Sequence, residues 1–407
     1  MSELSTGRKV GFTLGLLALL WLLVEGACAM GLWALARFKN LEYRPATVAA
    51  LEDKSEGILE AHLDEPNTYI VYDRELGWTV RPNASKSFYR ANAAGIRADR
   101  EYAPEPPAGV VRLAAFGDSF THASDVPNDS TWEARLEALD PRLEVLNYGV
   151  PGFGPDQALL RYRREGARFH PQVVLLGYMS ENISRVVNTF RPFYFPRSGM
   201  PFAKPRFELD GGNLVLVPNP VPALADYRQV LDHPQEWLPR LGEHDWFYQR
   251  DSARPRFDFL PSVRFVTVIG NQYFHQPFVV GGVYNPANEG FKVSVALFDA
   301  FVAEAIARGE VPICVLFPDR PDLRARHEGR PILYAPLRQE LAARGYRVID
   351  LLDSLGSRPA EEKVMRIHYN KEGNRLVAEQ VRAYLQAQGL DTPEGVARAL
   401  AALRARR

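Results

Sequence analysis

The chain has 407 residues, of which 46% are hydrophobic and 24% are charged. This balance is typical of a globular protein with a sizeable core and excludes a disordered chain. Lys plus Arg and Asp plus Glu number 49 each, so no net charge attracts nucleic acid, and we expect no nucleic acid partner. Cys28 and Cys314 are the only cysteines, which leaves no disulfide framework and no metal cluster.

An apolar run near the N-terminus predicts a transmembrane anchor over residues 1–40. Val10 to Ala36 is 27 residues long with Glu25 as its only charge, and at ~1.5 Å per residue it is long enough to cross a bilayer. A cleaved signal peptide is the alternative, but Ala27-Cys28-Ala29 is followed by more apolar sequence rather than by a polar mature start. Glu25 is costly at the bilayer centre, so we expect it to pair with another helix or to lie near the interface.

The charges that flank this run leave its orientation open. Arg8 and Lys9 precede it, whereas Arg37, Lys39 and Arg44 follow it, so positive charge is not concentrated on one side. The signal-anchor pattern alone favours a single-pass membrane protein whose catalytic domain is extracytoplasmic (periplasmic).

Residues 41–109 are predicted to form a connector with a small β element. The segment 38–64 has a charged, helical pattern, and the segment 68–83 alternates as strands do around turns. Pro104-Glu-Pro-Pro107 is a stiff linker, and it marks the start of the next domain.

Strand-like and helix-like segments alternate through residues 110–390. Ser130 and Glu133 have the spacing of a capping box at the start of the first helix. The alternation predicts an α/β fold with a doubly wound, flavodoxin-like parallel sheet covered on both faces. We expect strands at 112–116, 144–147, 173–176, 313–317 and 347–351, and further helices at 155–164, 293–308, 335–343 and 371–386.

Residues 187–291 interrupt this alternation and predict a large aromatic-rich insert or cap, with a hairpin at 206–217. Its aromatic side chains would stack on sugar rings or bury an acyl chain, and packing of the cap itself is an equal alternative. They are Phe190, Phe193, Tyr194, Phe195, Trp237, Trp246, Phe247 and Tyr248. Residues 391–407 predict a last, basic helix capped by Thr392.

Ser119 follows the strand-like run 111–116 directly after Gly117-Asp118. A serine on the turn after a strand can act as an acyl-transfer nucleophile if a base and an oxyanion site meet it there. The loops at the carboxyl ends of parallel strands share one edge, where ligands bind. We therefore expect Ser119 to lie close to the loops of residues 147–154, 177–182 and 367–373.

These loops resemble the four blocks of the SGNH (GDSL-type) hydrolases. Gly117-Asp118-Ser119 is similar to the first block, Gly152 in Asn-x-x-x-x-Gly to the second, Asn182 to the third, and His368 to the last, with Asn370 as a plausible helix cap. The resemblance implies that Ser119 is the nucleophile and His368 its base. It also implies that the amides of Ser119 and Gly152 and the side chain of Asn182 hold the oxyanion.

The chain departs from this family pattern at two places. Met365 stands where the family usually has an aspartate three residues before the histidine, so the group that orients His368 is not identified. A backbone carbonyl, Glu361 or Glu362 are the alternatives. Glu181 and Ile183 flank Asn182 where glycine and aspartate are common.

Other polar residues near these loops have less defined roles. Asp118, Arg185, Arg191 and Arg197 are possible substrate-binding residues, with solvated surface as the alternative for the arginines. His122 is expected to point along the loop after Ser119 rather than to act as its base. Ser180 and Ser184 are expected to be polar lining.

The function expected from the sequence is that of a membrane-anchored serine esterase. It would form an acyl-enzyme with an ester-linked acyl group, on a small molecule or on a cell-envelope carbohydrate. We expect no metal and no organic cofactor. A polysaccharide O-acyltransferase with the same site, and a non-catalytic glycan-binding or assembly protein with a degenerate site, are the alternatives.

Overall fold

A five-stranded parallel sheet forms the centre of the computed structural model, which describes residues 5–39, 41–43, 53–64, 68–195, 199–357 and 361–405. Its strands are β5 (Val111–Gly117), β6 (Leu143–Gly149), β7 (Val173–Met179), β12 (Val311–Phe317) and β13 (Val348–Asp350). The spatial order is β13-β12-β7-β5-β6. This is the 2-1-3-4-5 order of a flavodoxin-like sheet, and it confirms the predicted fold class.

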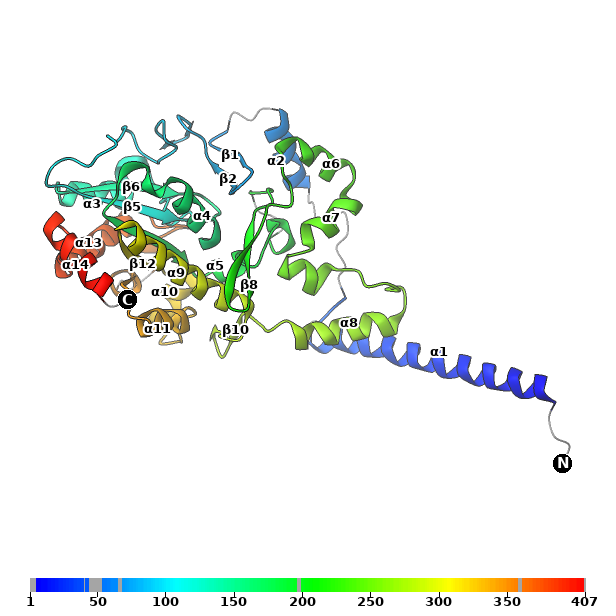
Figure 1. Ribbon diagram of the computed structural model, residues 1–407. Helices are drawn as coiled ribbons and strands as arrows, with labels where there is room; N and C mark the ends of the chain where they lie inside the picture. The colour runs from blue at the N-terminus through cyan, green and yellow to red at the C-terminus, as the bar shows by residue number, and fades with distance from the viewer. Residues whose placement is uncertain are drawn as a thin grey trace.

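Helices cover both faces of this sheet (Figure 1). Because the inner strands are buried along their whole length, alternate side chains enter two separate cores: Ala114 and Phe116 enter one, and Leu113 and Ala115 enter the other. The helices α4 (Pro155–Glu165), α9 (Glu289–Arg308) and α11 (Ala335–Ala343) pack in the first core. The second core is closed by α3 (Trp132–Leu139), α13 (Lys371–Ala387) and α14 (Pro393–Ala405).

The predicted capping box of α3 is wrong. Ser130 belongs to a 3-10 turn, Asn128–Ser130, and its hydroxyl donates to Asp129. Thr131 caps α3 instead, because its Oγ1 accepts from the amide of Ala134 at 3.2 Å. Thr392 does cap α14, as predicted, through the amide of Gly395 at 3.2 Å.

The connector packs against the sheet domain. It contains α2 (Asp53–Asp64) and the short strands β1 (Ile70–Asp73), β2 (Gly77–Val80), β3 (Ser85–Lys86) and β4 (Tyr89–Arg90). The helix expected over 38–64 is only partly present, since α1 (Thr6–Lys39) ends at Lys39, and residues 44–52 lie outside the described residues. Trp78 Nε1 donates to the Pro151 carbonyl at 3.0 Å, so the connector contacts the turn that contains Gly152.

The insert lies between α5 (Asn182–Arg185) and α9, and it contains the predicted hairpin. Its elements are β8 (Arg206–Asp210), β9 (Asn213–Val217), α6 (Tyr227–Asp232), α7 (Pro234–Gly242), α8 (Pro261–Phe274), β10 (Val279–Val280) and β11 (Val283–Tyr284). After β12 the chain adds α10 (Arg320–His327), and after β13 it adds α12 (Leu352–Leu355).

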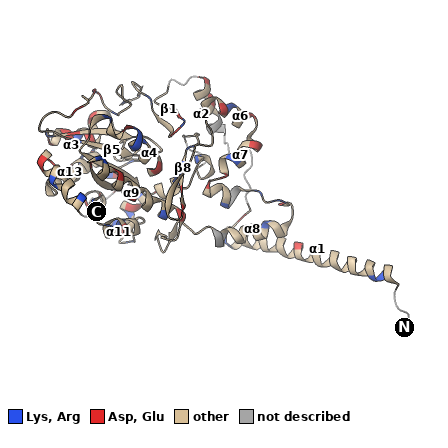
Figure 2. Ribbon diagram, viewed as in Figure 1, with Lys and Arg blue, Asp and Glu red and all other residues tan. Residues whose placement is uncertain are grey.

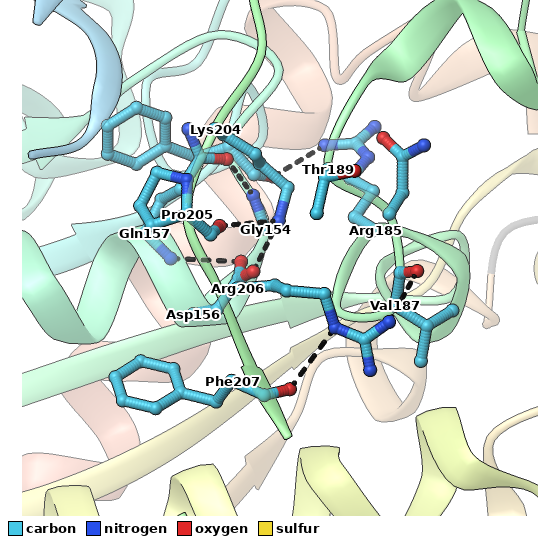
Figure 3. A network of polar contacts seen from close by, with 12 residues as sticks. Gly154, Asp156, Gln157, Arg185, Val187, Thr189, Lys204, Pro205, Arg206 and Phe207 are labelled. Atoms are coloured by element: carbon cyan, nitrogen blue, oxygen red, sulfur yellow. Dashed lines mark hydrogen bonds and ion pairs between the residues drawn. The ribbon is translucent and has the colours of Figure 1, made fainter. Parts of the chain in front are cut away.

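A buried ion pair fixes the insert to the sheet domain (Figure 3). Lys204 Nζ contacts Asp156 Oδ2 and donates to the Pro205 carbonyl at 3.1 Å. Burial lowers the pKa of Lys204 below its ordinary value, although Asp156 opposes this effect. Asp156 lies in the first turn of α4, directly after the glycine-rich turn, so the pair ties the insert to one of the loops of the site.

The N-terminal helix α1 projects from the body (Figure 1) and is long and apolar enough to cross a membrane. Figure 2 shows it almost free of charged residues along its length. Its C-terminal part is flanked by α8 of the insert.

We predict that Lys204→Met destabilises the fold by about 3–5 kcal/mol, because it leaves the buried Asp156 carboxylate without its partner. Urea denaturation of the full chain in non-ionic detergent measures this loss. Arg330→Met removes a partner from the exposed Arg330–Glu328 pair, so it serves as the control, with a change within about 0.5 kcal/mol. Equal effects of the two variants would contradict a structural role for the buried pair.

Candidate active site

The turn after β5 presents Ser119 at the carboxyl edge of the sheet. Asp118 Oδ1 accepts from the amide of Phe120 at 2.8 Å, and the amide of Ser124 donates to the Ser119 carbonyl at 3.1 Å. Gly117 allows this turn to close, since a Cβ at that position would lie 2.1 Å from Thr121 Oγ1. The Ser119 hydroxyl is therefore held on a tight turn at the end of β5, between β7 and the edge strand β6.

His368 lies against this hydroxyl. Its Nε2 is 2.8 Å from Ser119 Oγ, although the two residues are 249 positions apart. Asn370 fixes the start of α13 just after His368, because its side chain accepts from the amides of Glu372 and Gly373 at 2.9 and 3.0 Å. The cap predicted at Asn370 is confirmed.

Asp125 orients His368, a partner that the sequence reasoning missed. Asp125 Oδ1 is 3.0 Å from His368 Nδ1, and Oδ2 accepts from the backbone amides of His368 and Ile367 at 3.0 and 3.3 Å. Burial disfavours the Asp125 anion, but the hydrogen bonds from His368 and Ile367 outweigh it and hold its pKa below the ordinary value. The Asp125 carboxylate, the His368 ring and the Ser119 hydroxyl thus form one continuous series of hydrogen bonds.

The alternatives weighed for this orienting role are wrong. Glu361 Oε1 pairs with Arg324 Nη2 at 2.7 Å, and Glu362 is exposed. Met365 is buried in the second core, so an aspartate at that position would lose the water that solvates it. The only sequence signal for Asp125 was a carboxylate six residues after the serine.

The glycine-rich turn after β6 packs directly on the serine turn. A Cβ on Gly149 would lie 2.2 Å from the His122 amide nitrogen, so only glycine allows this approach. Gly152 adopts φ +85°, the left-handed region that favours glycine. Within the described ranges, neither the Ser119 amide nor the Gly152 amide donates to another residue, and both therefore remain available as donors.

Asn182 opens α5 at the end of β7 and is fully buried. In the orientation that gives both the nitrogen and the oxygen of its amide a hydrogen-bond partner, Nδ2 donates to Asp118 Oδ2 at 3.1 Å and Oδ1 accepts from the Met179 amide at 3.2 Å. One amide hydrogen is used by Asp118, which leaves the second for another acceptor. Asn182 is therefore tied to the serine turn.

Glu181, at one of the positions that depart from the family pattern, binds two arginines beside the glycine-rich turn. Its Oε2 is 3.0 Å from Arg185 Nη2, and its Oε1 is 3.4 Å from Arg191 Nη2. Tyr194 OH donates to the same Oε1 at 2.7 Å. Burial disfavours the Glu181 anion, but Arg185, Arg191 and Tyr194 outweigh it and lower its pKa to about 2.

The two arginines in turn hold the carbonyls of the Gly152 turn. Arg191 Nη1 donates to the Gly152 carbonyl at 2.9 Å, and Arg185 Nη1 donates to that of Phe153 at 2.8 Å. Arg185 also contacts Asp118 at 3.4 Å. Of the possible substrate-binding residues, Asp118 and Arg185 are thus buried and occupied by protein partners, whereas Arg197 lies outside the described residues.

Three other polar residues lie away from the nucleophile's hydrogen bonds. His122 is buried, and its ring nitrogens contact Tyr69 OH at 2.9 Å and Ser124 Oγ at 3.0 Å. Burial, together with the charge of Arg97, lowers its pKa well below the ordinary value. Ser180 donates to Asp322, and the half-buried Ser184 donates its amide to the Glu181 carbonyl at 2.9 Å.

Most of the insert's aromatic rings pack against one another. Phe190, Trp237, Trp246 and Tyr248 are buried, and Tyr194 stacks on Phe247 with centroids 5.0 Å apart. Phe195 differs, since 47% of it is exposed and its ring lies 5.9 Å from the guanidinium of Arg191. One exposed aromatic ring therefore stands beside the arginine that holds Gly152.

We predict that Asp125→Asn lowers kcat for p-nitrophenyl acetate by about 10³- to 10⁴-fold, because an amide at this position favours the wrong tautomer of His368. Glu361→Gln is the matched control and keeps full activity, since Glu361 faces Arg324. Initial rates of the full chain in detergent measure both. Loss of activity in Glu361→Gln together with full activity in Asp125→Asn would contradict the orienting role of Asp125.

We predict that Glu181→Gln lowers kcat about 10- to 100-fold, the effect of losing a charged hydrogen-bonding partner of about 1.5–3 kcal/mol. Without the carboxylate, the two guanidinium groups repel each other, and the Gly152 carbonyl loses its fixed donor. Glu208→Gln, at a carboxylate paired with the exposed His244, is the control. Unchanged kcat in Glu181→Gln would show that the arginines hold the turn without it.

No family model matches the chain, and no curated protein does. It is similar to a putative lipolytic protein of the G-D-S-L family from Desulfitobacterium hafniense DCB-2 (14% identity, TM-score 0.34, 68% of this chain and 99% of that one). It is also similar to the lipase/acylhydrolase from Enterococcus faecalis (13% identity, TM-score 0.35, 68% and 96%). The fold class follows from the sheet itself: the chain has the doubly wound α/β fold that the sequence predicted, with strand order 2-1-3-4-5.

Proposed function

We propose that the protein is a membrane-anchored serine esterase that removes ester-linked acyl groups from a cell-envelope carbohydrate. The observation that carries the proposal is the chain of hydrogen bonds from Asp125 through His368 to Ser119 Oγ. A hydroxyl 2.8 Å from a ring nitrogen, whose other nitrogen faces a carboxylate, is the arrangement that activates a serine for acyl transfer.

The reaction proceeds in two steps. Ser119 Oγ attacks the ester carbonyl while its proton passes to His368 Nε2, and collapse of the tetrahedral intermediate breaks the ester bond as that proton passes to the leaving alcohol oxygen. A water molecule then attacks the acyl-enzyme and gives its proton to His368. Cleavage of the acyl bond releases a carboxylic acid and returns the proton to Ser119.

The donors around Ser119 support stabilisation of the oxyanion. The free amides of Ser119 and Gly152 and the second amide hydrogen of Asn182 are the three donors that we assign to it. The lowered pKa of Asp125 favours its anion, which stabilises the imidazolium that forms during each proton transfer. The arginines on the Gly152 and Phe153 carbonyls keep the turn in one conformation.

Two features support a carbohydrate of the cell envelope as the acyl carrier. The exposed Phe195 ring, next to Arg191 at the Gly152 turn, offers a face on which a sugar ring stacks. The apolar helix α1 holds the body at a membrane, and we place that body on its extracytoplasmic side, where such polymers are assembled.

Two other functions, a non-catalytic binding protein and an O-acyltransferase, are distinguished from an esterase by different observations. The carboxylate of Asp125 within hydrogen-bond reach of His368 weighs against a non-catalytic protein with a degenerate site. An O-acyltransferase uses the same acyl-enzyme and differs only in whether a sugar hydroxyl or water resolves it. The fate of the acyl group therefore decides between hydrolysis and transfer.

We predict that a fluorophosphonate probe labels the full chain in detergent at Ser119, as located by mass spectrometry. Ser119→Ala abolishes the adduct, and His368→Gln slows its formation by about 10³-fold or more, because the hydroxyl loses its base. Ser184→Ala, at a half-buried serine away from His368, leaves labelling unchanged. An acetylated oligosaccharide then releases acetate in water.

A folded chain that forms no adduct at Ser119 would contradict the esterase proposal. Labelled Ser119 with acetyl transfer to an added oligosaccharide, and no free acetate, would replace the esterase by the acyltransferase. The Ser119→Ala chain controls both assays for spontaneous hydrolysis.

A further inference from the structure

The helix α8 of the insert lies alongside the C-terminal part of α1, far from the active site (Figure 1). The two helices approach closely at Gly31, where a Cβ would lie 2.6 Å from Phe265 Cε2. Glycine at this position therefore lets the Phe265 ring pack on the α1 backbone. The contact joins the N-terminal helix to a segment more than 200 residues away in sequence.

Glu25, the acidic residue of α1, also contacts α8. Glu25 Oε2 accepts from the backbone amide of Ser262 at 2.9 Å, and Oε1 accepts from its hydroxyl at 2.7 Å. Ser262 is in the first turn of α8, whose backbone N–H groups have no partner within the helix. A carboxylate is favourable there because it meets both these donors and the positive end of the helix dipole.

The length of α1 sets the depth of this contact. A helix needs about 20 apolar residues to cross the hydrocarbon core, and counted from Val10 the span ends at Ala29. Glu25 is four residues inside that limit, a depth of about 6 Å at the helical rise. The beginning of α8, which reaches Glu25, lies at the same depth.

The chain that leads into α8, together with the beginning of α8, has the surface of a membrane-contacting segment. Phe257, Phe259 and Val266 are 54%, 68% and 67% exposed, although large apolar side chains are ordinarily buried. Arg254 and Arg256, which precede them, are also exposed, and guanidinium groups pair with lipid phosphate at the bilayer surface. The exposed apolar side chains continue the apolar surface of α1, where Met30 and Trp33 are exposed as well.

We propose that residues 254–266 form a shallow membrane-inserted hairpin, in the leaflet where the C-terminal end of α1 leaves the bilayer. Phe257 and Phe259 enter the lipid, and Ser262 satisfies the Glu25 carboxylate there. The inference rests on the proposed anchoring by α1. A second point of contact restricts rotation of the body about α1 and so holds the esterase domain in one orientation over the membrane.

The test measures what surrounds Phe259 in the full chain. A Phe259→Cys variant in a Cys28→Ser background is labelled with an environment-sensitive fluorophore, since Cys314 is buried and stays unlabelled. The protein is reconstituted into phosphatidylcholine–phosphatidylglycerol vesicles. Quenching by lipid-attached nitroxide and by aqueous iodide is then compared with that at Phe88→Cys, an exposed aromatic site on the body, and at Leu17→Cys, an exposed site on α1.

The expected result is that lipid nitroxide quenches position 259 as strongly as position 17, with iodide quenching several-fold weaker than at position 88. Iodide quenching at position 259 equal to that at position 88 would overturn the hairpin, while lipid quenching at position 17 would leave the anchor intact. Shielding from both quenchers would mean that protein covers the hairpin, which also overturns the proposal. Absence of lipid quenching at position 17 would remove the anchor, and with it this inference, without touching the esterase chemistry.

Discussion

The hydrogen bonds between Asp125 and His368 are the constraint on which the site depends. One carboxylate oxygen meets the ring and the other meets two backbone amides, so Asp125 fixes both the loop and the ring orientation of His368, which lies against Ser119. Because Asp125 and Ser119 belong to the same loop after β5, a single loop sets the positions of both side chains. His368 then has to meet both, and the cap of α13 at Asn370 brings it there.

A second set of contacts makes the insert part of the site rather than an addition to it. Arg191, near the start of the insert, holds the Gly152 carbonyl, and Lys204 pairs with Asp156 just after the same turn. Glu181 keeps the guanidinium groups of Arg185 and Arg191 together despite their like charge. Besides the hydrogen bond from Trp78 to the Pro151 carbonyl, the two arginines give the glycine-rich turn contacts that glycine, which has no side chain, does not make itself. The charged side chains therefore add rigidity to the turn.

The contact between α1 and the insert follows the same physical rule as the site: a charge in apolar surroundings needs partners. Glu25 in an apolar helix meets the amide and hydroxyl of Ser262 at the start of α8. The insert thus contacts α1 at one end, through α8, and the Gly152 turn at the other, through Arg191. The segment between α5 and α9 therefore contacts both α1 and the edge of the sheet where Ser119 lies.

The sequence by itself determined the sheet, the position of Ser119 and the loops of Gly152, Asn182 and His368, because apolar periods and glycine turns act locally. It also placed the apolar span and the hairpin at 206–217 correctly, but it misassigned the cap of α3, where Ser130 and Thr131 are adjacent equivalents. Only the tertiary structure decided that Asp125 contacts His368, that Glu181 meets Arg191, and that Glu25 meets Ser262. Asp125 and Glu25 act on residues more than 200 positions away, and Glu181 acts through the fold of the insert. Such pairings depend on how loops meet in space, which no local pattern of residues encodes.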